Sequence, residues 1–408
     1  MNEQVEKARE VGLAVLQPSQ KDLDHGLELH SNSLVFESYG FSPRAAVDGD
    51  AVARLVEEGA SNVEIGETLE DMFLTRMVED ADLRQEYRDA FDYAGADCIF
   101  QNAGEECQDP GQLLKRLGNF TYLTDMLDEF MARVIRPDDI VRAKEAGKHC
   151  LYMSGNGVPL VQQWKTVEEE LRFVRVFFQL GIRMMHLTYN RRNMLGDGCE
   201  EKSDVGLSDF GAAAVREMNK FGVIVDVAHS GQQTGIDAAT VSEKPVVASH
   251  SGAHALSGHP RCKKDEVIRA IVDKGGTVGV CCISAFLGGS GDINAFLDHI
   301  DYIADKFGTE SVTIGTDRAY VPPRDAEERR KIPRRGASRI RFEGFWQPDD
   351  PLKDPKWRDE RMQQSLAWTN WPLLTVGMVQ RGYSDDDIQK ILGGNILRVA
   401  REVFPDIP

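Results

Sequence analysis

The segment VIVDVAH at positions 223–229 decides how this chain folds, because a run of apolar, mostly β-branched residues leads directly into a histidine. Two later segments end in a similar way, PVVASH at 245–250 and VTIGTD at 312–317. Segments that are apolar nearly throughout are typical of parallel strands covered on both faces. Because the carboxyl ends of neighbouring parallel strands lie together, we expect His229, His250 and Asp317 to meet around one point.

Short apolar runs of this kind alternate with helical patterns along most of the chain. The predicted strands are 34–36, 97–101, 150–154, 184–187, 223–227, 246–249, 277–282 and 312–315. The predicted helices include 112–135, 166–180, 208–220, 264–274 and 292–306. Eight strands alternating with helices favour a closed (β/α)8 TIM-like barrel, and an open doubly wound sheet is the alternative.

Two stretches depart from this alternation, and we expect both to be insertions in a single barrel domain that spans residues 1–408. Residues 51–93 are helical in pattern and follow the first strand. Residues 322–359 are rich in Pro, Arg and Asp, which predicts a long loop after strand eight, on the face where barrel enzymes carry their sites. The aromatic residues within 342–346 either cover the pocket or pack this loop down.

The composition excludes several classes of protein. With 41% apolar and 28% charged residues, the 408-residue chain is neither disordered nor fibrous. A net charge of −18 argues against nucleic acid or an anionic membrane as the main partner. We see no secretory signal and no apolar run of about 18 residues, and the seven scattered cysteines suit free thiols. These features predict a cytoplasmic protein.

The residues at the strand ends suggest metal chemistry. Two imidazoles and a carboxylate are a common ligand set for Zn²⁺ and similar ions. Asp226, in the strand before His229, has the alternative role of orienting a ring from behind. The alternative is that each histidine is a structural residue whose ring nitrogens form ordinary hydrogen bonds and bind no metal. We interpret His186 in that way, because no partner is evident from the sequence.

At these residues the chain resembles the renal, or membrane, dipeptidase family of metallopeptidases, which are amidohydrolase-like barrels. The resemblance runs from about Lys144 to Phe404. It is carried by GLSDFGAAAVREMNKFGVIVDVAHSG (206–231), PVVASHSGAHAL (245–256), HPRCKKDEVIRAIVDKGGTVGV (259–280), LDHIDYIADKFGTESVTIGTD (297–317) and GGNILRVAREVF (393–404).

The resemblance implies a TIM-like barrel that holds two zinc ions bridged by a glutamate and hydrolyses dipeptides. By this resemblance, His229 and His250 match the histidines that hold the second metal. Arg261 matches the arginine that grips the substrate's carboxylate, and Asp317 matches the acidic residue that handles the proton. Members of the family often dimerise, so a homodimer stays open, although no patch in this sequence requires one.

Several family positions carry other residues here. Ser38 and Gly40 stand where the family has the His-x-Asp pair of the first metal, and Glu37 and Tyr39 face away unless a bulge intervenes. Asn156 replaces the bridging glutamate, and Tyr189 replaces a histidine that contacts the substrate. We therefore expect one zinc ion or none.

Three functions are compatible with this pattern. The first is hydrolysis of a small amide or dipeptide with a free carboxylate, with Asp317 as general base, Tyr189 as a donor to the oxyanion, and Asn156 as a further contact. The second is a barrel enzyme of the same ancestry with changed, metal-free chemistry around Tyr189, Asp317 and Ser38. The third is a non-catalytic protein that binds a small molecule.

Overall fold

The apolar runs form the strands of one parallel sheet in the computed structural model, which describes residues 2–104, 109–334 and 344–405. Neighbouring strands follow the order β1-β2-β4-β5-β6-β7-β8-β9, and β3 pairs with β4 outside this path. The strands are β1 (Phe36–Gly40), β2 (Cys98–Asn102), β3 (Met131–Arg133), β4 (His149–Gly155), β5 (Ile182–His186), β6 (Ile224–Asp226), β7 (Val246–Ser251), β8 (Thr277–Val280) and β9 (Val312–Ile314).

The first and last strands of this order meet, so the sheet is a barrel that is nearly closed. Directly after β9, the Asp317 N–H donates to the Tyr39 carbonyl at 3.4 Å, and the Phe41 N–H donates to the Arg318 carbonyl at 3.2 Å. Inside the barrel, the Ser38 hydroxyl donates to the Ser249 carbonyl at 2.7 Å, which ties β1 to β7. The predicted (β/α)8 barrel is confirmed, and the open sheet is excluded.

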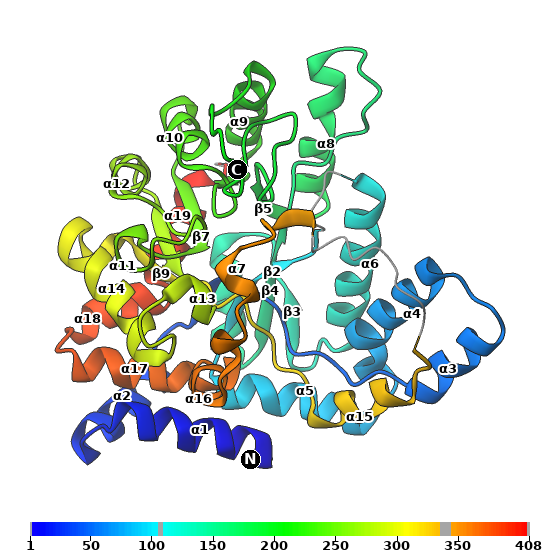
Figure 1. Cartoon of the computed structure of the whole chain (residues 1–408), viewed down its shortest axis with the longest axis vertical. Coiled ribbons are helices and arrows are strands. Elements are labelled where there is room, and N and C mark those ends of the chain that lie inside the picture. The colour runs from blue at the N-terminus through cyan, green and yellow to red at the C-terminus, as the bar shows by residue number, and fades with distance from the viewer. Residues whose placement is uncertain (1, 105–108, 335–343, 406–408) are drawn as a thin grey trace.

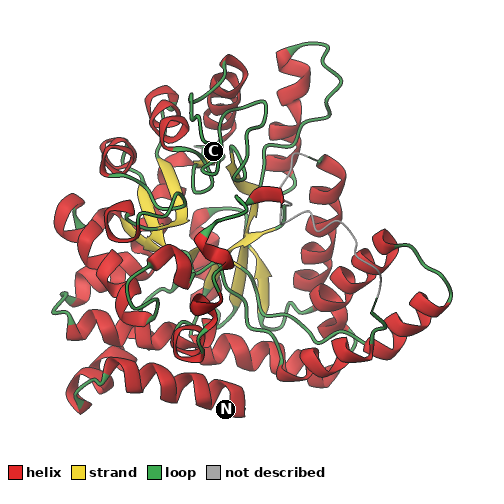
Figure 2. Cartoon of the chain, in the orientation of Figure 1, coloured by secondary structure: helices red, strands yellow, loops and turns green. Residues whose placement is uncertain are grey.

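Helices surround the strands on the outside, as Figure 1 and Figure 2 show. Before the β6 segment they are α1 (Glu3–Leu16), α2 (Gln20–Asn32), α3 (Gly49–Glu57), α4 (Asn62–Thr75), α5 (Ala81–Ala94), α6 (Pro110–Met126), α7 (Pro137–Glu145), α8 (Val167–Gln179) and α9 (Asp209–Phe221). After it they are α10 (Gln232–Val241), α11 (His254–Ser257), α12 (Asp265–Asp273), α13 (Ser284–Leu287), α14 (Ile293–Phe307), α15 (Pro323–Lys331), α16 (Glu360–Ser365), α17 (Trp371–Gln380), α18 (Asp385–Gln389) and α19 (Asn395–Val403).

The early part of the barrel interior is filled by apolar and aromatic side chains. Phe36, at the start of β1, stacks on Phe100 with ring centroids 5.3 Å apart, and Phe100 lies 4.8 Å from Tyr152. These rings are buried, and their burial provides hydrophobic stabilisation at this level of the barrel. The polar residues follow later along the strands, so the interior changes from apolar to polar towards the carboxyl ends.

The structure differs from the sequence predictions at three places. The predicted helix 112–135 ends at Met126, because the chain turns and Met131–Arg133 pairs with β4 as the additional strand β3. The first strand begins two residues later than predicted and includes polar residues that find buried partners. The charged N-terminal segment forms α1 and α2, and α1 is tied to the C-terminal helices by the Asn370 amide, which donates to the Ala8 carbonyl at 2.9 Å.

The two segments that we predicted as insertions contain helices where the structure describes them. Helices α3, α4 and α5 follow β1, and the segment after β9 contains α15 and two short 3₁₀ helices, Pro351–Lys353 and Pro355–Arg358. Residues 335–343, which include part of the aromatic group within 342–346, lie outside the described residues.

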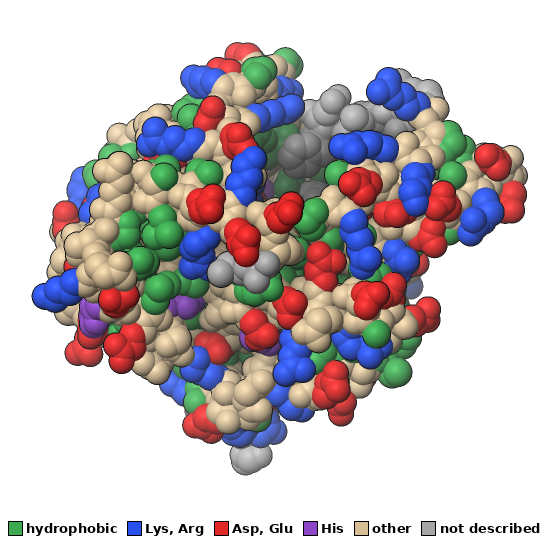
Figure 3. Space-filling view, turned by 90° about the horizontal axis from the view of Figure 1, so that it is seen from below, with side chains coloured by type: hydrophobic (Ala, Val, Ile, Leu, Met, Phe, Trp, Pro, Cys, Tyr) green, Lys and Arg blue, Asp and Glu red, His purple; other side chains and the backbone are tan. Residues whose placement is uncertain are grey.

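Charged side chains of both signs lie on the surface of the protein. On the face drawn in Figure 3, acidic and basic side chains are interspersed. Within the described residues, no helix combines the length and the apolar character that crossing a bilayer requires.

Candidate metal and substrate site

Three histidines meet at the carboxyl ends of three adjacent strands. His186 is the last residue of β5, His229 follows β6 by three residues, and His250 lies near the end of β7. One ring nitrogen from each lies within 4.8 Å of the others, and all three side chains are buried. The structure therefore brings His229 and His250 together, as their places at matching strand ends indicated. Sequence analysis missed His186, although it ends its strand in the same way.

Hydrogen bonds determine which nitrogens of His229 and His250 carry protons. Asn190 Oδ1 lies 2.7 Å from His229 Nδ1, and an amide oxygen only accepts, so the proton of His229 is on Nδ1. The Ser249 hydroxyl donates to Asp226, so Ser249 Oγ accepts from His250 Nδ1 at 2.8 Å. Both Nε2 atoms then carry lone pairs, and they face each other at 3.0 Å.

Asp226 is the residue that organises this hydrogen-bond network. Its carboxylate also accepts from the backbone N–H groups of Ala228 at 2.9 Å and Ser249 at 3.1 Å, and His186 Nε2 lies 2.8 Å from Oδ2. Burial alone would raise the pKa of Asp226, but the His186 imidazole and the hydrogen bonds from Ser249 outweigh burial and lower it. Asp226 is therefore an ionised carboxylate behind the histidines, which fits its alternative role of orienting a ring.

Two buried cations lie beside the histidines. Arg261 donates to the carbonyl oxygens of Ala228 and, at 3.1 Å, of His250, and its Nη2 lies 3.4 Å from His229 Nε2. Lys263 donates to the Ser230 carbonyl at 2.7 Å, and burial lowers its pKa to about 8. Burial, followed by the charge of Arg261, lowers the pKa of both His229 and His250 well below the usual range, so both rings are neutral and able to bind a cation.

A bulge in β1 brings Tyr39 into the barrel interior. The register of β1 against β2 shifts between Glu37 and Gly40, and the Tyr39 ring stacks on His250 with centroids 3.8 Å apart. Its hydroxyl donates to Asn156 Oδ1 at 2.7 Å. Tyr39 therefore contacts both Asn156 and His250. Simple alternation predicts the opposite direction for Tyr39, because only the bulge changes the face to which it points.

The bulge leaves Glu37 outside the histidine site. Its carboxylate accepts hydrogen bonds from Thr316 and, at 2.9 Å, from Trp368 Nε1. Burial raises the pKa of Glu37 to about 8, against the effect of these donors. A Cβ at Gly40 would lie 2.2 Å from the Glu37 carboxylate, so a metal ligand at this position would require the Glu37 side chain to move.

The remaining predicted residues are Tyr189, which contacts His229, and Asp317, whose backbone N–H donates to Tyr39. Tyr189 stacks on His229 with centroids 3.9 Å apart, and Phe345 of the loop after β9 packs against Tyr189 at 5.1 Å. Phe345 therefore covers this side of the site. Asp317 follows β9, is half-buried, and has a left-handed φ of 56°. In the buried donor group with His229 and His250, His186 takes the place in which we expected Asp317.

The cysteines do not contribute a nucleophile to this site. The six cysteines in the described residues are free and buried, and Cys107 lies outside them. Cys199 approaches the site, and its thiol donates to Asn190 Oδ1 at 3.2 Å. Burial raises the pKa of Cys199 to about 12, so its thiol stays protonated.

The donor atoms fit one metal ion and do not fit two. Two nitrogens on a tetrahedral zinc ion lie roughly 3.3 Å apart, given Zn–N distances of about 2.0–2.1 Å, and the facing lone pairs of His229 and His250 are close to this spacing. By the family resemblance, the ligands of a second ion come from β1 and from the segment after β4, where this chain has Ser38, Gly40 and Asn156. Ser38 already donates to the Ser249 carbonyl, and the Asn156 oxygen accepts from Tyr39.

A nearly closed parallel barrel with histidines at successive strand ends is typical of the amidohydrolase-like fold. Comparison with known proteins gives the family. The profile of the membrane dipeptidase family (peptidase family M19) matches residues 71–334, which is more than half of the chain. The chain belongs to this family.

Individual relatives are distant. Dipeptidase tcpJ of Claviceps purpurea (strain 20.1) is 26% identical over 286 residues, which cover 69% of this chain and 57% of tcpJ. An amidohydrolase from Pseudomonas aeruginosa is similar in structure with a TM-score of 0.65 at 25% identity, covering 93% of this chain and 99% of its own. The probable dipeptidase PvdM from the same organism also has a TM-score of 0.65, at 20% identity, covering 94% of this chain and 98% of its own. The last of these likenesses concerns the fold alone.

Proposed function

We propose that this protein hydrolyses a small amide, such as a dipeptide with a free carboxylate, with one divalent ion held by His229, His250 and His186. Zn²⁺ is the ion we propose, because neutral imidazoles are its common ligands. The observation that carries the proposal is the pair of facing Nε2 lone pairs on His229 and His250, 3.0 Å apart and fixed by Asn190 and Ser249. Two such lone pairs repel each other unless a cation lies between them.

Arg261 is the group we propose for the substrate's carboxylate. Its Nε is buried and has no hydrogen-bond partner among the described residues, so one N–H of the guanidinium stays available to an acceptor. A carboxylate is the acceptor that a guanidinium binds best, because the hydrogen bonds are charge-assisted. The position beside His229 orients such a substrate with its amide near the histidines.

The other residues have roles in orientation and proton transfer. Asp317, at the carboxyl end of β9, takes and returns the proton, and Tyr189 and Asn156 contact the substrate from opposite sides of the histidines. A bound divalent ion would lower the pKa of a water molecule and polarise the amide carbonyl. Phe345, packed on Tyr189, excludes water from this side of the site.

Metal content is the measurement that tests this proposal. Elemental analysis of the purified protein should give about one transition-metal ion per chain, and the double variant His229→Ala/His250→Ala should lose it. The wild type should also hydrolyse members of a dipeptide panel, and EDTA should abolish this activity. Two ions per chain would contradict our assignment of β1 and Asn156, and no ion would contradict metal-dependent hydrolysis.

One observation favours a second candidate function, metal-free chemistry in a barrel of the same ancestry. The guanidinium of Arg261 lies 3.4 Å from His229 Nε2 and is itself a donor to that lone pair. In that case, EDTA-treated protein keeps its full turnover and the His229→Ala variant still loses it. Binding of a dipeptide without any turnover would instead identify a small-molecule binding protein.

The cellular compartment and the oligomeric state are also proposals. The six free, buried cysteines of the described residues suit a reducing compartment such as the cytoplasm. A homodimer is a common arrangement for soluble enzymes. Light scattering of the purified chain would give the oligomeric state.

A further inference from the structure

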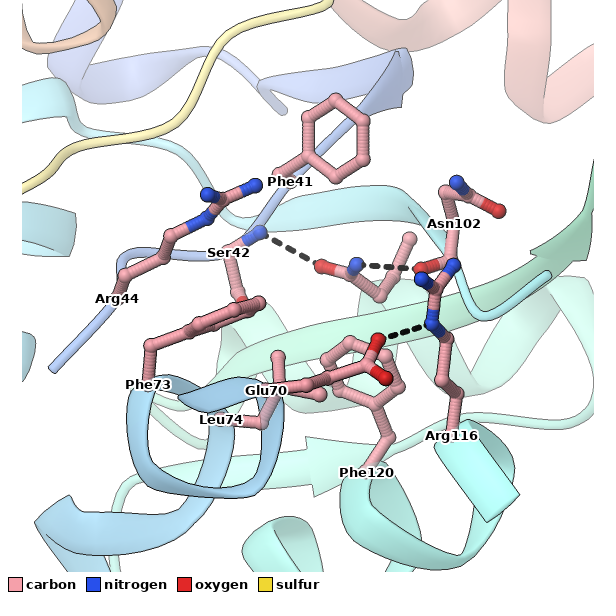
Figure 4. A pocket seen from close by; sticks show the side chains of 10 residues that line it. Phe41, Ser42, Arg44, Glu70, Phe73, Leu74, Asn102, Arg116 and Phe120 are labelled. Atoms are coloured by element: carbon pink, nitrogen blue, oxygen red, sulfur yellow. Dashed lines mark hydrogen bonds and ion pairs between the residues drawn. The ribbon is translucent and has the colours of Figure 1, made fainter. Parts of the chain in front are cut away.

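A second cavity lies beside the histidine site, at the carboxyl ends of β1 and β2. It has a volume of about 160 Å³, several times the room that a single water molecule needs. Its walls come from the segment after β1, the end of β2, and helices α4 and α6, and Figure 4 shows Arg44 on one side with Asn102 and Arg116 on the other. Helix α4 belongs to the insertion after β1, so a segment outside the regular barrel helps to form this pocket.

Most polar groups that line the pocket already have a hydrogen-bond or ion-pair partner. Gln101 accepts from the Ser42 N–H at 2.6 Å and donates to the Asn102 carbonyl at 2.8 Å. Arg116 forms an ion pair with Glu70 of α4. These contacts hold the wall in place before any ligand enters, and they neutralise the charge of Arg116.

Arg44 is the exception, because its charge has no carboxylate beside it. Its guanidinium lies over the ring of Phe73, 4.6 Å from the centroid, and 5.8 Å from the centroid of Phe41. No carboxylate in the described part of the chain comes within ion-pair distance of Arg44. Asp325 and Glu70 act on its charge from further away, and burial, which outweighs them, lowers its pKa. In a protein with a net charge of −18, an enclosed cation that lacks a counter-ion is a specific local feature.

The pocket is next to the histidines. Phe41 contacts Tyr39 edge-to-face, with ring centroids 5.8 Å apart, and Tyr39 stacks on His250. On the other side, Arg116 donates to the Gly104 carbonyl, and Gly104 lies so close to Asn156 that a Cβ would come within 2.3 Å of the Asn156 nitrogen. The pocket and the histidines are thus separated by the rings of Phe41 and Tyr39. For a substrate whose amide lies at the histidines, this pocket is the neighbouring cavity for one of its side chains.

We infer that this pocket selects a substrate side chain that carries a carboxylate, with Arg44 as the specificity-determining residue. This inference rests on the proposed function. The aromatic walls Phe41 and Phe73 suit the apolar stem of such a side chain, and Arg44 provides the charge-assisted hydrogen bonds for its end. Asn102 keeps an amide N–H group on the opposite wall, since its oxygen accepts from the Gly104 N–H at 2.8 Å.

Other side chains fit this chemistry less well. A neutral apolar side chain would displace water from Arg44 and leave its guanidinium without an acceptor, which costs free energy. A basic side chain would meet Arg44 and Arg116, and Glu70 is the one acidic residue among the described residues that line the pocket. The charge of the walls thus favours an acidic ligand over both.

The test compares dipeptides that contain glutamate with matched dipeptides that contain glutamine, at each of the two positions. Calorimetry on EDTA-treated protein gives the dissociation constants, and hydrolysis assays on untreated protein give kcat/KM. For the wild type we expect at least tenfold tighter binding of the glutamate dipeptide at one position. The preference should fall to about one in Arg44→Gln and persist in Arg54→Gln, an exposed arginine on α3 that serves as the matched control.

A conservative variant distinguishes the loss of the positive charge from misfolding of the protein. Arg44→Lys keeps the positive charge and should retain more than a threefold preference, while thermal melting reports whether each variant is folded. Equal affinity for glutamate and glutamine dipeptides in the wild type, or no binding of the glutamate dipeptide at all, overturns the inference. A glutamate preference in binding without any hydrolysis would overturn the proposed function and leave the pocket assignment intact.

Discussion

Replacing Asp226 with asparagine should destabilise the protein more than any surface carboxylate replacement. The Asp226 carboxylate accepts from Ala228 N, Ser249 N and the Ser249 hydroxyl, and it contacts His186. Asparagine keeps one oxygen for the two backbone donors, but its amide nitrogen then faces the hydroxyl and the imidazole. Hydrogen bonds to charged groups contribute about 1.5–3 kcal/mol each, and the substitution disturbs the contacts of Oδ2 with the Ser249 hydroxyl and with His186. Because Ser249 can rotate, we expect a loss of about 3 kcal/mol.

Urea unfolding of EDTA-treated protein measures this loss without a contribution from bound metal. The matched control is Asp80→Asn, because Asp80 also accepts two backbone hydrogen bonds, from Asp82 and Leu83 at 3.0 Å, at the start of α5. Asparagine caps helices as well as aspartate does, so the control should change stability by less than about 0.5 kcal/mol. If both variants lose the same amount, the carboxylate does not organise the histidines. A second readout is zinc affinity, which should fall roughly 10–100-fold in Asp226→Asn.

Two further predictions concern other parts of the barrel. Because burial raises the pKa of Glu37 from 4.5 to about 8, the folded state keeps a proton there that the unfolded chain has lost. The stability that this proton provides is therefore complete below pH 4.5 and is lost as the pH rises to about 8, at up to about 1.4 kcal/mol per pH unit. Glu37→Gln should flatten this slope in urea unfolding at several pH values, and an unchanged slope would assign it to other groups. Phe100→Ala should cost about 3–5 kcal/mol, because it leaves a cavity between Phe36 and Tyr152, and a loss below 1 kcal/mol would mean that these rings close the gap.

The barrel and two of its histidines were predictable because their signals are local. A strand buried on both faces is apolar almost throughout, so segments such as 223–227 and 246–249 stand out from the surrounding sequence. The position of a polar residue directly after such a strand then places it at the carboxyl edge. On this basis the sequence alone predicts that His229 and His250 share one site. The sequence predicts the ends of the strands less well, because the end of a strand depends on its pairing partners elsewhere in the fold.

The features that sequence analysis missed depend on tertiary contacts. His186 was interpreted as structural because its partner, Asp226, lies 40 residues along the chain and meets it only through the pairing of β5 with β6. Tyr39 was expected to face away because a bulge leaves no pattern in a single sequence. The short strand β3 was hidden at the end of a predicted helix, because three residues are too few to show a period of two.

Charge balance explains why the proposed site holds one ion when the family resemblance implies two. Arg261 and Lys263 already place two buried cations beside the histidines, and Asp226 is the ionised carboxylate directly behind them. A dinuclear centre would add four positive charges at the place where Asn156 has taken over from the bridging glutamate. A single divalent ion on neutral imidazoles needs no bridging carboxylate. The space beside β1 is then filled by the ring of Tyr39, which stacks on His250. A single ion therefore fits both the absence of acidic side chains at Ser38, Gly40 and Asn156 and the inward position of Tyr39. A second ion would require changes at both places.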